Sequence, residues 1–307
     1  MWRTRAYRFE DRSELTLAFR DPSATSDRER VRELFRTMLP YFLHERTHDW
    51  KFLAQQRRVC AMLNGRVGRV LDIGCGPGLM TEALVERGGE VWGVDFLEPA
   101  LAWARAEAEK ASWGDRAHYV AGDAQALPFA AATFDTVIAM GVLEYLSDAY
   151  RFVAEVRRVL RPGGLLVISV PSRIAPYHLA QSFLDRFVGP PYRLIRRLVT
   201  GSVRRGHIPD HPRHPLAPWR LDRILTRARF RKQASAFTHF CVYPLDRFFP
   251  DLSRRIDRRC TALEESPLLG WLGTQYIVAA VRGGEIGPAP ATSSSDHEAV
   301  ANHDRSR

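Results

Sequence analysis

Short apolar runs alternate with helical patterns over about one hundred residues, and this alternation constrains the fold more than any other feature. The runs that predict strands are RVLDIG (69–74), EVWGVD (90–95), AHYVAGD (117–123), FDTVIAMG (134–141) and GGLLVISV (163–170). The stretches between most of them (79–88, 98–110 and 147–164) space their apolar residues as helices do. Strands alternating with helices predict a parallel sheet covered on both faces, and ligands of such sheets bind at the carboxyl ends of the strands.

Helical patterns also flank this core. Apolar residues recur at helical spacing over 28–43 and 49–63, before a stop signal at Asn64-Gly65. After residue 171 the pattern predicts helices at 176–188 and 218–228 and two last strands at 233–243 and 274–281. We therefore expect an α/β, Rossmann-like, seven-stranded and mostly parallel sheet with helices on both faces, N-terminal helices and two helical insertions.

The expected domain organisation follows from these patterns. Residues 1–64 are predicted to form an N-terminal helical extension and 65–283 the main domain. The insertions at 172–215 and 244–273 are expected to form an acceptor lid or a membrane-facing surface. The tail, 284–307, consists of Pro, Ala, Ser and charged residues and is predicted to be disordered.

Positive charge is concentrated in one region of the chain. The net charge is +10, and residues 186–260 hold 18 Arg or Lys against 5 Asp and no Glu. In the second insertion a set of apolar residues has helical spacing: Phe249, Leu252, Ile256, Cys260 and Leu263. Arg254, Arg255 and Arg258 point elsewhere on the same helix, which predicts a basic amphipathic helix.

Composition excludes several classes of protein. No run of about 18 apolar residues occurs, so no membrane span is expected. The N-terminus MWRTRAYRFEDR lacks the apolar centre of a secretory signal. The four cysteines are far apart and form no CxxC pair, which favours a reducing cytoplasm over a disulfide framework or a zinc site.

The loop after the first predicted strand, GCGPG, has an unusually bare backbone. A dinucleotide-binding loop would place a third glycine at residue 79, where this chain has Leu79. The triphosphate-binding pattern requires G-K-[ST], and no such triplet follows. The helix that opens here also has no Lys or Arg in its first turn to meet a phosphate. The loop therefore suits a ligand that has no pyrophosphate.

Acidic residues stand at the ends of the next strands. Asp95 follows Gly74 by 21 residues and can accept hydrogen bonds from both hydroxyls of a ribose. Asp123, with the backbone N–H of Ala124, can bind the amino group and a ring nitrogen of adenine, and Phe96 can lie against the adenine face. Asp72 places negative charge near the glycine loop. Together these residues suit a ligand with a ribose, an adenine and a cationic part.

Five ordered blocks carry a family resemblance: VLDIGCGPG, VDFLEPAL, GDAQALPF, FDTVIAMGVLEYL and VLRPGGLLVISVP. From about residue 69 to 171 the chain resembles the class I S-adenosylmethionine-dependent methyltransferases, and more narrowly the branch of ubiquinone and menaquinone biosynthesis. The resemblance implies an enzyme with S-adenosylmethionine as cofactor. The residues that it implies bind the cofactor are Asp72, Gly74, Gly76, Gly78, Asp95, Phe96, Asp123, Ala124 and Met140, with Gly141 beside the sulfonium.

Candidates for catalysis lie outside the cofactor motifs. Methyl transfer needs a base only when the acceptor must lose a proton, and Glu144 and Tyr145 are the nearest candidates after the fourth strand. Many relatives have His at the position of Tyr145. Because this chain has Tyr there, the role of that His in the relatives is in doubt for this chain. Glu144 has an alternative, structural interpretation, in which it caps or orients the next helix.

A histidine-rich loop, GHIPDHPRHP, contains His207, Asp210, His211 and His214. Its prolines exclude a regular helix, so the H-x3-H spacing does not favour a metal site, and no metal is expected. The loop leads back to the sheet beside the predicted site. A substrate-side role for His207 or His214 is therefore a candidate.

The sequence does not identify the acceptor. We expect methylation of a small-molecule or lipid-like acceptor, at oxygen or carbon. A non-catalytic cofactor-binding or partner-binding protein and an RNA methyltransferase are alternatives; nucleic acid is disfavoured because no RNA-binding module is recognisable. The basic insertions suit an anionic membrane surface, which would place the chain in the cytoplasm on the inner face of the membrane. A soluble enzyme that draws an anionic acceptor, and a merely solvated basic face, are the other interpretations.

Overall fold

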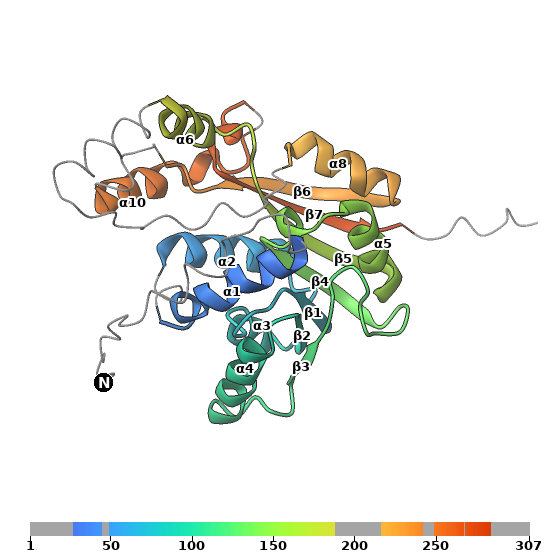
Figure 1. Cartoon of the computed structure of the whole chain (residues 1–307). Coiled ribbons are helices and arrows are strands. Elements are labelled where there is room, and N and C mark those ends of the chain that lie inside the picture. Colours follow the sequence, from blue (N-terminus) through green and yellow to red (C-terminus); the bar gives the residue numbers. More distant parts are fainter. Residues whose placement is uncertain (1–26, 45–48, 188–215, 242–248, 267, 284–307) are drawn as a thin grey trace, which may run out of the picture.

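A computed structural model describes residues 27–44, 49–187, 216–241, 249–266 and 268–283. Its centre is one seven-stranded sheet in the order β3-β2-β1-β4-β5-β7-β6 (Figure 1). The strands are β1 (Arg69–Ile73), β2 (Glu90–Asp95), β3 (Ala117–Ala121), β4 (Phe134–Met140), β5 (Leu160–Pro171), β6 (Phe230–Thr238) and β7 (Gln275–Arg282). Strand β7 is antiparallel to both of its neighbours, and the other strands run parallel to one another. The expected fold class is confirmed.

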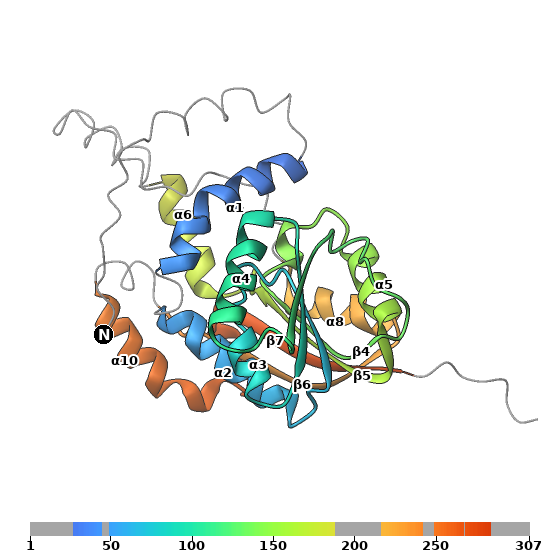
Figure 2. The same ribbon diagram turned by 90° about the horizontal axis from the view of Figure 1, so that it is seen from below.

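Helices cover both faces of this sheet because successive strand residues point to opposite sides. On one face, α5 (Ala149–Val159) and α8 (Pro218–Arg227) pack on Leu71, Ile168 and Val278. On the other face, α2 (Trp50–Leu63) and α3 (Thr81–Val85) pack on Val70 and Val167. Figure 2 shows these two layers on opposite sides of the strands. The sheet edge at β2 and β3 is covered by α4 (Glu98–Lys110).

The N-terminal helices extend this core. Helix α1 (Asp27–His44) lies over the carboxyl ends of the parallel strands, and α2 contributes Val59 and Leu63 to the buried cluster under the sheet. A 3-10 turn, η3 (Leu143–Tyr145), follows β4. The expected helices at 28–43 and 49–63 are thus present.

The C-terminal part contains α6 (Pro176–Phe187), α10 (Pro250–Arg259) and the 3-10 turns η4 (Thr261–Leu263) and η5 (Gly270–Leu272). The histidine-rich loop, most of the first insertion and the tail from residue 284 lie outside the described residues. Within the described ranges, no helix combines the length and apolarity needed to span a bilayer.

Two local predictions are corrected. The strand expected at 233–243 begins earlier, at Phe230, and ends at Thr238. As the last strand of the sheet, β6 exposes Arg231, Lys232 and Gln233 to solvent, so its first half lacks the apolar signal of a buried strand. The helix expected up to residue 164 ends at Val159, and the following RPGG turn belongs to β5.

The amphipathic helix of the second insertion is present, and its apolar face is only partly buried: Ile256 and Cys260 are half-buried. Phe249 and Leu252 are exposed, whereas Ser253 is buried. Asp257 adds a polar contact on this side, since its Oδ1 accepts a hydrogen bond of 2.8 Å from the backbone N–H of Phe240. The hydrophobic spacing therefore located the helix correctly, and the packed side overlaps the predicted apolar face without coinciding with it.

Candidate functional site

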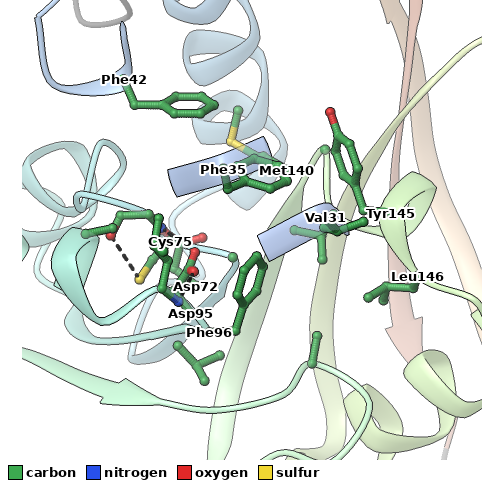
Figure 3. Close-up of a pocket in the computed structure, with 18 of the residues that line it drawn as sticks. Val31, Phe35, Phe42, Asp72, Cys75, Asp95, Phe96, Met140, Tyr145 and Leu146 are labelled. Atoms are coloured by element: carbon green, nitrogen blue, oxygen red, sulfur yellow. Dashed lines mark hydrogen bonds between the residues drawn. The ribbon is translucent and has the colours of Figure 1, made fainter. Parts of the chain in front are cut away.

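A cavity of about 580 Å³ lies at the carboxyl ends of β1, β2, β3 and β4, under α1. This volume is within the range of small-molecule sites, about 300–1,000 Å³. Figure 3 shows Asp72, Cys75 and Asp95 on one wall and Phe35 and Phe42 of α1 on the opposite one. Predicted site residues that line the cavity are Asp72, Gly74, Gly76, Asp95, Phe96, Asp123, Ala124, Met140, Gly141, Glu144 and Tyr145. The structure thus brings together side chains from four strand ends.

The glycine loop can approach a ligand closely because of its backbone geometry. Gly74 and Gly76 have φ angles of 70° and 52°, a region that favours glycine. A Cβ on Gly74 would stand 2.4 Å from Cγ2 of Val142, whereas a Cβ on Gly76 would meet no atom within 4 Å. Gly74 therefore fits the loop against the end of β4, and Gly76 faces open space in the cavity.

Gly78 has a different position from the other two loop glycines. It does not line the cavity, and a Cβ there would stand 2.8 Å from the Tyr119 hydroxyl. That hydroxyl is 2.8 Å from Thr81 Oγ1 at the start of α3. The geometry supports a packing role for Gly78, which permits close approach of α3 to β3; its predicted contact with the cofactor stays a prediction.

Asp95 organises the loop as well as facing the cavity. Its Oδ2 accepts the N–H of Gly76 at 2.9 Å and its Oδ1 accepts the N–H of Leu97 at 2.9 Å. Burial raises the pKa of Asp95, and these backbone hydrogen bonds oppose the rise. A carboxylate fixed in this way presents its remaining lone pairs to a ligand hydroxyl.

Asp72 is 3% exposed and lies at the floor of the cavity. Burial, followed by the nearby charge of Asp95, raises the pKa of Asp72 to about 7. Two carboxyl groups so close together favour a cationic ligand, which would relieve both the desolvation and the repulsion. The floor of the cavity is thus suited to the ammonium and sulfonium groups of S-adenosylmethionine.

Asp123 has partners on both of its carboxylate oxygens. Oδ1 accepts the N–H of Gln125 at 2.9 Å, and Oδ2 forms an ion pair with Arg28 of α1. The carboxylate predicted to bind adenine is therefore held by the N-terminal helix in this structure. Sequence reasoning did not identify Arg28 as part of the site, because nothing near Arg28 in the chain indicates a partner 95 residues away.

Helix α1 closes the cavity with aromatic side chains that sequence reasoning also missed. The Phe35 ring lies 6.0 Å from Phe96 and 4.9 Å from Tyr145, with edge-to-face geometry in both pairs. The Arg32 guanidinium lies 5.9 Å from the centre of the Phe96 ring. Phe35 therefore joins the predicted adenine side of the cavity to the predicted acceptor side. The sequence signal was the apolar stripe of 28–43, which is equally consistent with an ordinary core-facing helix.

A buried polar contact holds the end of β4. Gln55 of α2 is 5% exposed, and its Nε2 donates a hydrogen bond of 2.7 Å to Ser169 Oγ on β5. The same Oγ accepts the N–H of Gly141 at 3.2 Å. Gln55 also lines the cavity. This network fixes the backbone where the transferable methyl group is expected to lie. Its only signal in the sequence was one polar residue, Gln55, within the apolar face of 49–63.

The two candidate bases occupy neighbouring positions after β4. Glu144 is 5% exposed and lines the cavity, and its Oε1 would be 3.4 Å from a Cβ on Gly141. Tyr145 lines the same wall and packs on Phe35. The third candidate, His214, lies with His207, Asp210 and His211 outside the described residues. Within the ranges that the structure describes, no group of three His, Cys, Asp or Glu could hold a metal ion.

The sequence is similar to that of known proteins over the same region. The family model described as "Methyltransferase domain" matches residues 71–168. A ubiquinone biosynthesis O-methyltransferase of Azorhizobium caulinodans is 34% identical over 136 residues, 44% of this chain and 51% of that protein. A tRNA U34 carboxymethyltransferase of Idiomarina loihiensis is 34% identical over 163 residues, 48% of this chain and 49% of that protein.

A solved structure shares the fold. The S-adenosylmethionine-dependent methyltransferase of Thermotoga maritima, described as a possible histamine N-methyltransferase, has a TM-score of 0.52 and 17% identity, and the match covers 81% of this chain and 99% of that one. The chain spans about half the length of the curated relatives just named. Residues 71–168 of this chain therefore match a methyltransferase domain in sequence, so the resemblance to methyltransferases that the motifs indicated is confirmed, and the fold that this resemblance implied is shared with a solved structure.

Proposed function

We propose that this chain transfers the methyl group of S-adenosylmethionine to a hydroxyl oxygen of a small, lipid-like acceptor. One observation carries the proposal: the acidic, glycine-lined end of the cavity continues directly into an apolar end built by α1 and η3. A charged cofactor suits the first end, and an apolar acceptor suits the second. O-methylation is supported by the relative named for ubiquinone biosynthesis.

The chemistry is an in-line displacement at the methyl carbon. The acceptor oxygen forms a bond to that carbon while the carbon–sulfur bond breaks, and the electron pair of that bond stays on sulfur in S-adenosylhomocysteine. Positioning of the two reactants can contribute roughly 7–11 kcal/mol of barrier lowering. Phe35, Met140 and Tyr145 would confine the acceptor behind the methyl carbon, since all three line the apolar end.

The acceptor hydroxyl must lose its proton, and Glu144 is the group we assign to take it. Glu144 is buried beside Gly141 at the junction of the two ends of the cavity. General-base catalysis by a positioned carboxylate typically contributes 10²–10⁴-fold. Tyr145 would orient the acceptor through its ring, which is fixed by Phe35.

The test combines substrate discovery with one variant. The chain is incubated with methyl-labelled S-adenosylmethionine and, in separate reactions, with phenols that have or lack an isoprenoid tail and with total RNA. Label is expected in tailed phenols, and kcat is expected to fall about 100-fold in Glu144→Gln while cofactor affinity is unchanged. Label in RNA alone, or in none of the phenols, would overturn the proposal. Full activity of Glu144→Gln would contradict the assignment of Glu144 as the base and would leave the proposed methyl transfer standing.

We also propose that the protein works in the cytoplasm. Support comes from its four cysteines, which are all free thiols as in reducing compartments. Fractionation of cells that express the full chain tests this location, and recovery in an oxidising compartment would contradict it.

A further inference from the structure

Basic and apolar side chains are exposed on α10 and on residues 268–271, none of which lines the cavity. We call these side chains together the α10 face. Figures 1 and 2 show α10 at the margin of the molecule, on the opposite side from α5 and α8. The proposed methyl transfer leaves this surface unused.

Helix α10 exposes both apolar and basic side chains. Phe249 is 60% exposed and Leu252 is 46% exposed. Leu252, Arg255 and Arg259 have i, i+3, i+7 spacing, so they lie along one side of the helix. Within the described part of the chain, the exposed arginines of this helix form no ion pair; they are Arg254, Arg255, Arg258 and Arg259.

The segment before β7 exposes further apolar side chains. Leu268 is 79% exposed, and Leu269 and Trp271 are also exposed. The Trp271 indole N–H donates a hydrogen bond of 2.8 Å to the Leu268 carbonyl, which holds the ring against its own turn. A tryptophan held beside exposed leucines is typical of side chains that lie at the boundary between water and lipid.

Short polar contacts fix the two segments relative to each other. The N–H of Phe240 donates to Asp257 of α10, and the N–H of Thr274 donates to the carbonyl of His239 at 3.1 Å. Residues 239–241 thus connect α10 to the end of the 268–271 segment. The His178 ring lies 3.4 Å from the Thr274 carbonyl, which joins α6 to the same support.

We propose that the α10 face docks on an anionic lipid bilayer. A helix that packs through Ser253 and Asp257 while it exposes leucine, phenylalanine and arginine has the charge and apolar character of an interfacial membrane helix. Arginine guanidinium groups pair with lipid phosphates, and the apolar side chains enter the acyl boundary. The proposed docking does not depend on which reaction occurs in the cavity.

The first test measures flotation of the full chain with vesicles. Vesicles of phosphatidylcholine with 30% phosphatidylglycerol are compared with pure phosphatidylcholine vesicles, at low and at high salt. Flotation is expected only with the anionic vesicles and is expected to weaken at high salt, because basic residues near a charged surface are screened. Absence of flotation with the anionic vesicles would overturn the proposal.

The second test locates the surface with matched variants. Arg255→Gln combined with Arg259→Gln is expected to lower vesicle affinity about 25-fold, at about fivefold per arginine. The control, Arg223→Gln with Arg231→Gln, removes the same charge from exposed positions on α8 and β6 and is expected to retain most of the affinity. Equal losses in both variants would show general electrostatic attraction and would overturn the assignment to α10.

The third test separates lipid from a protein partner. Leu268→Ser with Leu269→Ser is expected to reduce flotation, whereas Trp219→Ser on α8, which is also exposed, is expected to leave it unchanged. Binding of S-adenosylhomocysteine by calorimetry shows that each variant is folded. Sedimentation of the wild-type chain gives its oligomeric state, and dimerisation that the Leu268→Ser/Leu269→Ser variant abolishes would assign the face to a second copy instead. Normal flotation without methyl transfer would reject only the proposed function.

Discussion

The two ends of the cavity are built in different ways. At the cofactor end, the groups that face the ligand stand at strand ends and in the loop that directly follows β1, and backbone hydrogen bonds such as Gly76 N–H to Asp95 fix them. At the acceptor end, the walls come from α1 and η3, and side-chain contacts such as Phe35 on Tyr145 form them. The cofactor end is thus set by local chain geometry, whereas the acceptor end depends on packing between distant segments.

This difference predicts that changes at the cofactor end act on affinity for S-adenosylmethionine, and that changes at the acceptor end act on the acceptor. Asp95→Ala should have the largest effect, because it removes a predicted ribose ligand together with the two backbone contacts that shape the loop. We expect cofactor affinity to fall by about 1–3 kcal/mol, or roughly 5- to 150-fold, by calorimetry. Glu98→Ala, which removes an exposed ion pair with Arg105, is the control. Unchanged affinity in Asp95→Ala would place the ribose elsewhere.

At the cofactor end, Asp72→Asn is expected to have opposite effects on the stability of the protein and on its affinity for the cofactor. The pKa of Asp72 is raised to about 7 in the folded protein from an ordinary value near 3.8, so its ionisation destabilises the native state. Without cofactor, the free energy of unfolding should fall by about 1.4 kcal/mol per pH unit between about pH 4 and pH 7 and then level off. Asp72→Asn should remove this fall and raise the melting temperature at pH 8.

The same variant should bind the cofactor more weakly, about tenfold at pH 8, because an amide does not balance the charge of the ammonium or sulfonium. In the wild-type protein, affinity should rise with pH up to about 7 and then level off, with proton release on binding below that pH. Calorimetry in two buffers of different ionisation enthalpy measures the released proton. Equal affinity of Asp72→Asn and wild type at pH 8 would show that Asp72 does not meet a cation.

The same contrast explains what could be predicted from the sequence. The loop at Gly74 and the acidic residues at 95 and 123 were found because their signals lie within a few residues of each strand end. Phe35 was missed because its partners, Phe96 and Tyr145, are distant in the chain, and an aromatic residue in an amphipathic helix is equally consistent with a core position. For α10, spacing located the helix and the half-buried Ile256 and Cys260, but it did not show that Phe249 and Leu252 of the same face are exposed.

Phe35→Ala should act mainly at the acceptor end. Each edge-to-face pair contributes about 0.5–1.5 kcal/mol beyond its burial, and Phe35 makes one pair on each side of the cavity. We expect KM for the acceptor to rise about tenfold and the Kd of the cofactor to rise by a smaller factor, measured by initial rates and calorimetry. Glu33→Ala removes an ion pair with Arg36 on the same helix and controls for changes in α1 itself. A larger effect on the cofactor than on the acceptor would contradict the division between the two ends.

Arg28→Gln tests the contact through which α1 reaches the cofactor end. Arg28 holds Asp123 in the structure, and adenine is expected to use the same carboxylate. Both side chains are partly exposed, so the ion pair is worth at most about 1 kcal/mol. If Arg28 competes with adenine, Arg28→Gln should raise cofactor affinity up to about fivefold, and added salt should raise the affinity of the wild type but not that of the variant. Arg36→Gln, with its partner Glu33 away from Asp123, should show neither effect. A loss of affinity in Arg28→Gln would instead mean that Arg28 stays in place and positions Asp123 for the adenine, which would make α1 part of the cofactor end as well.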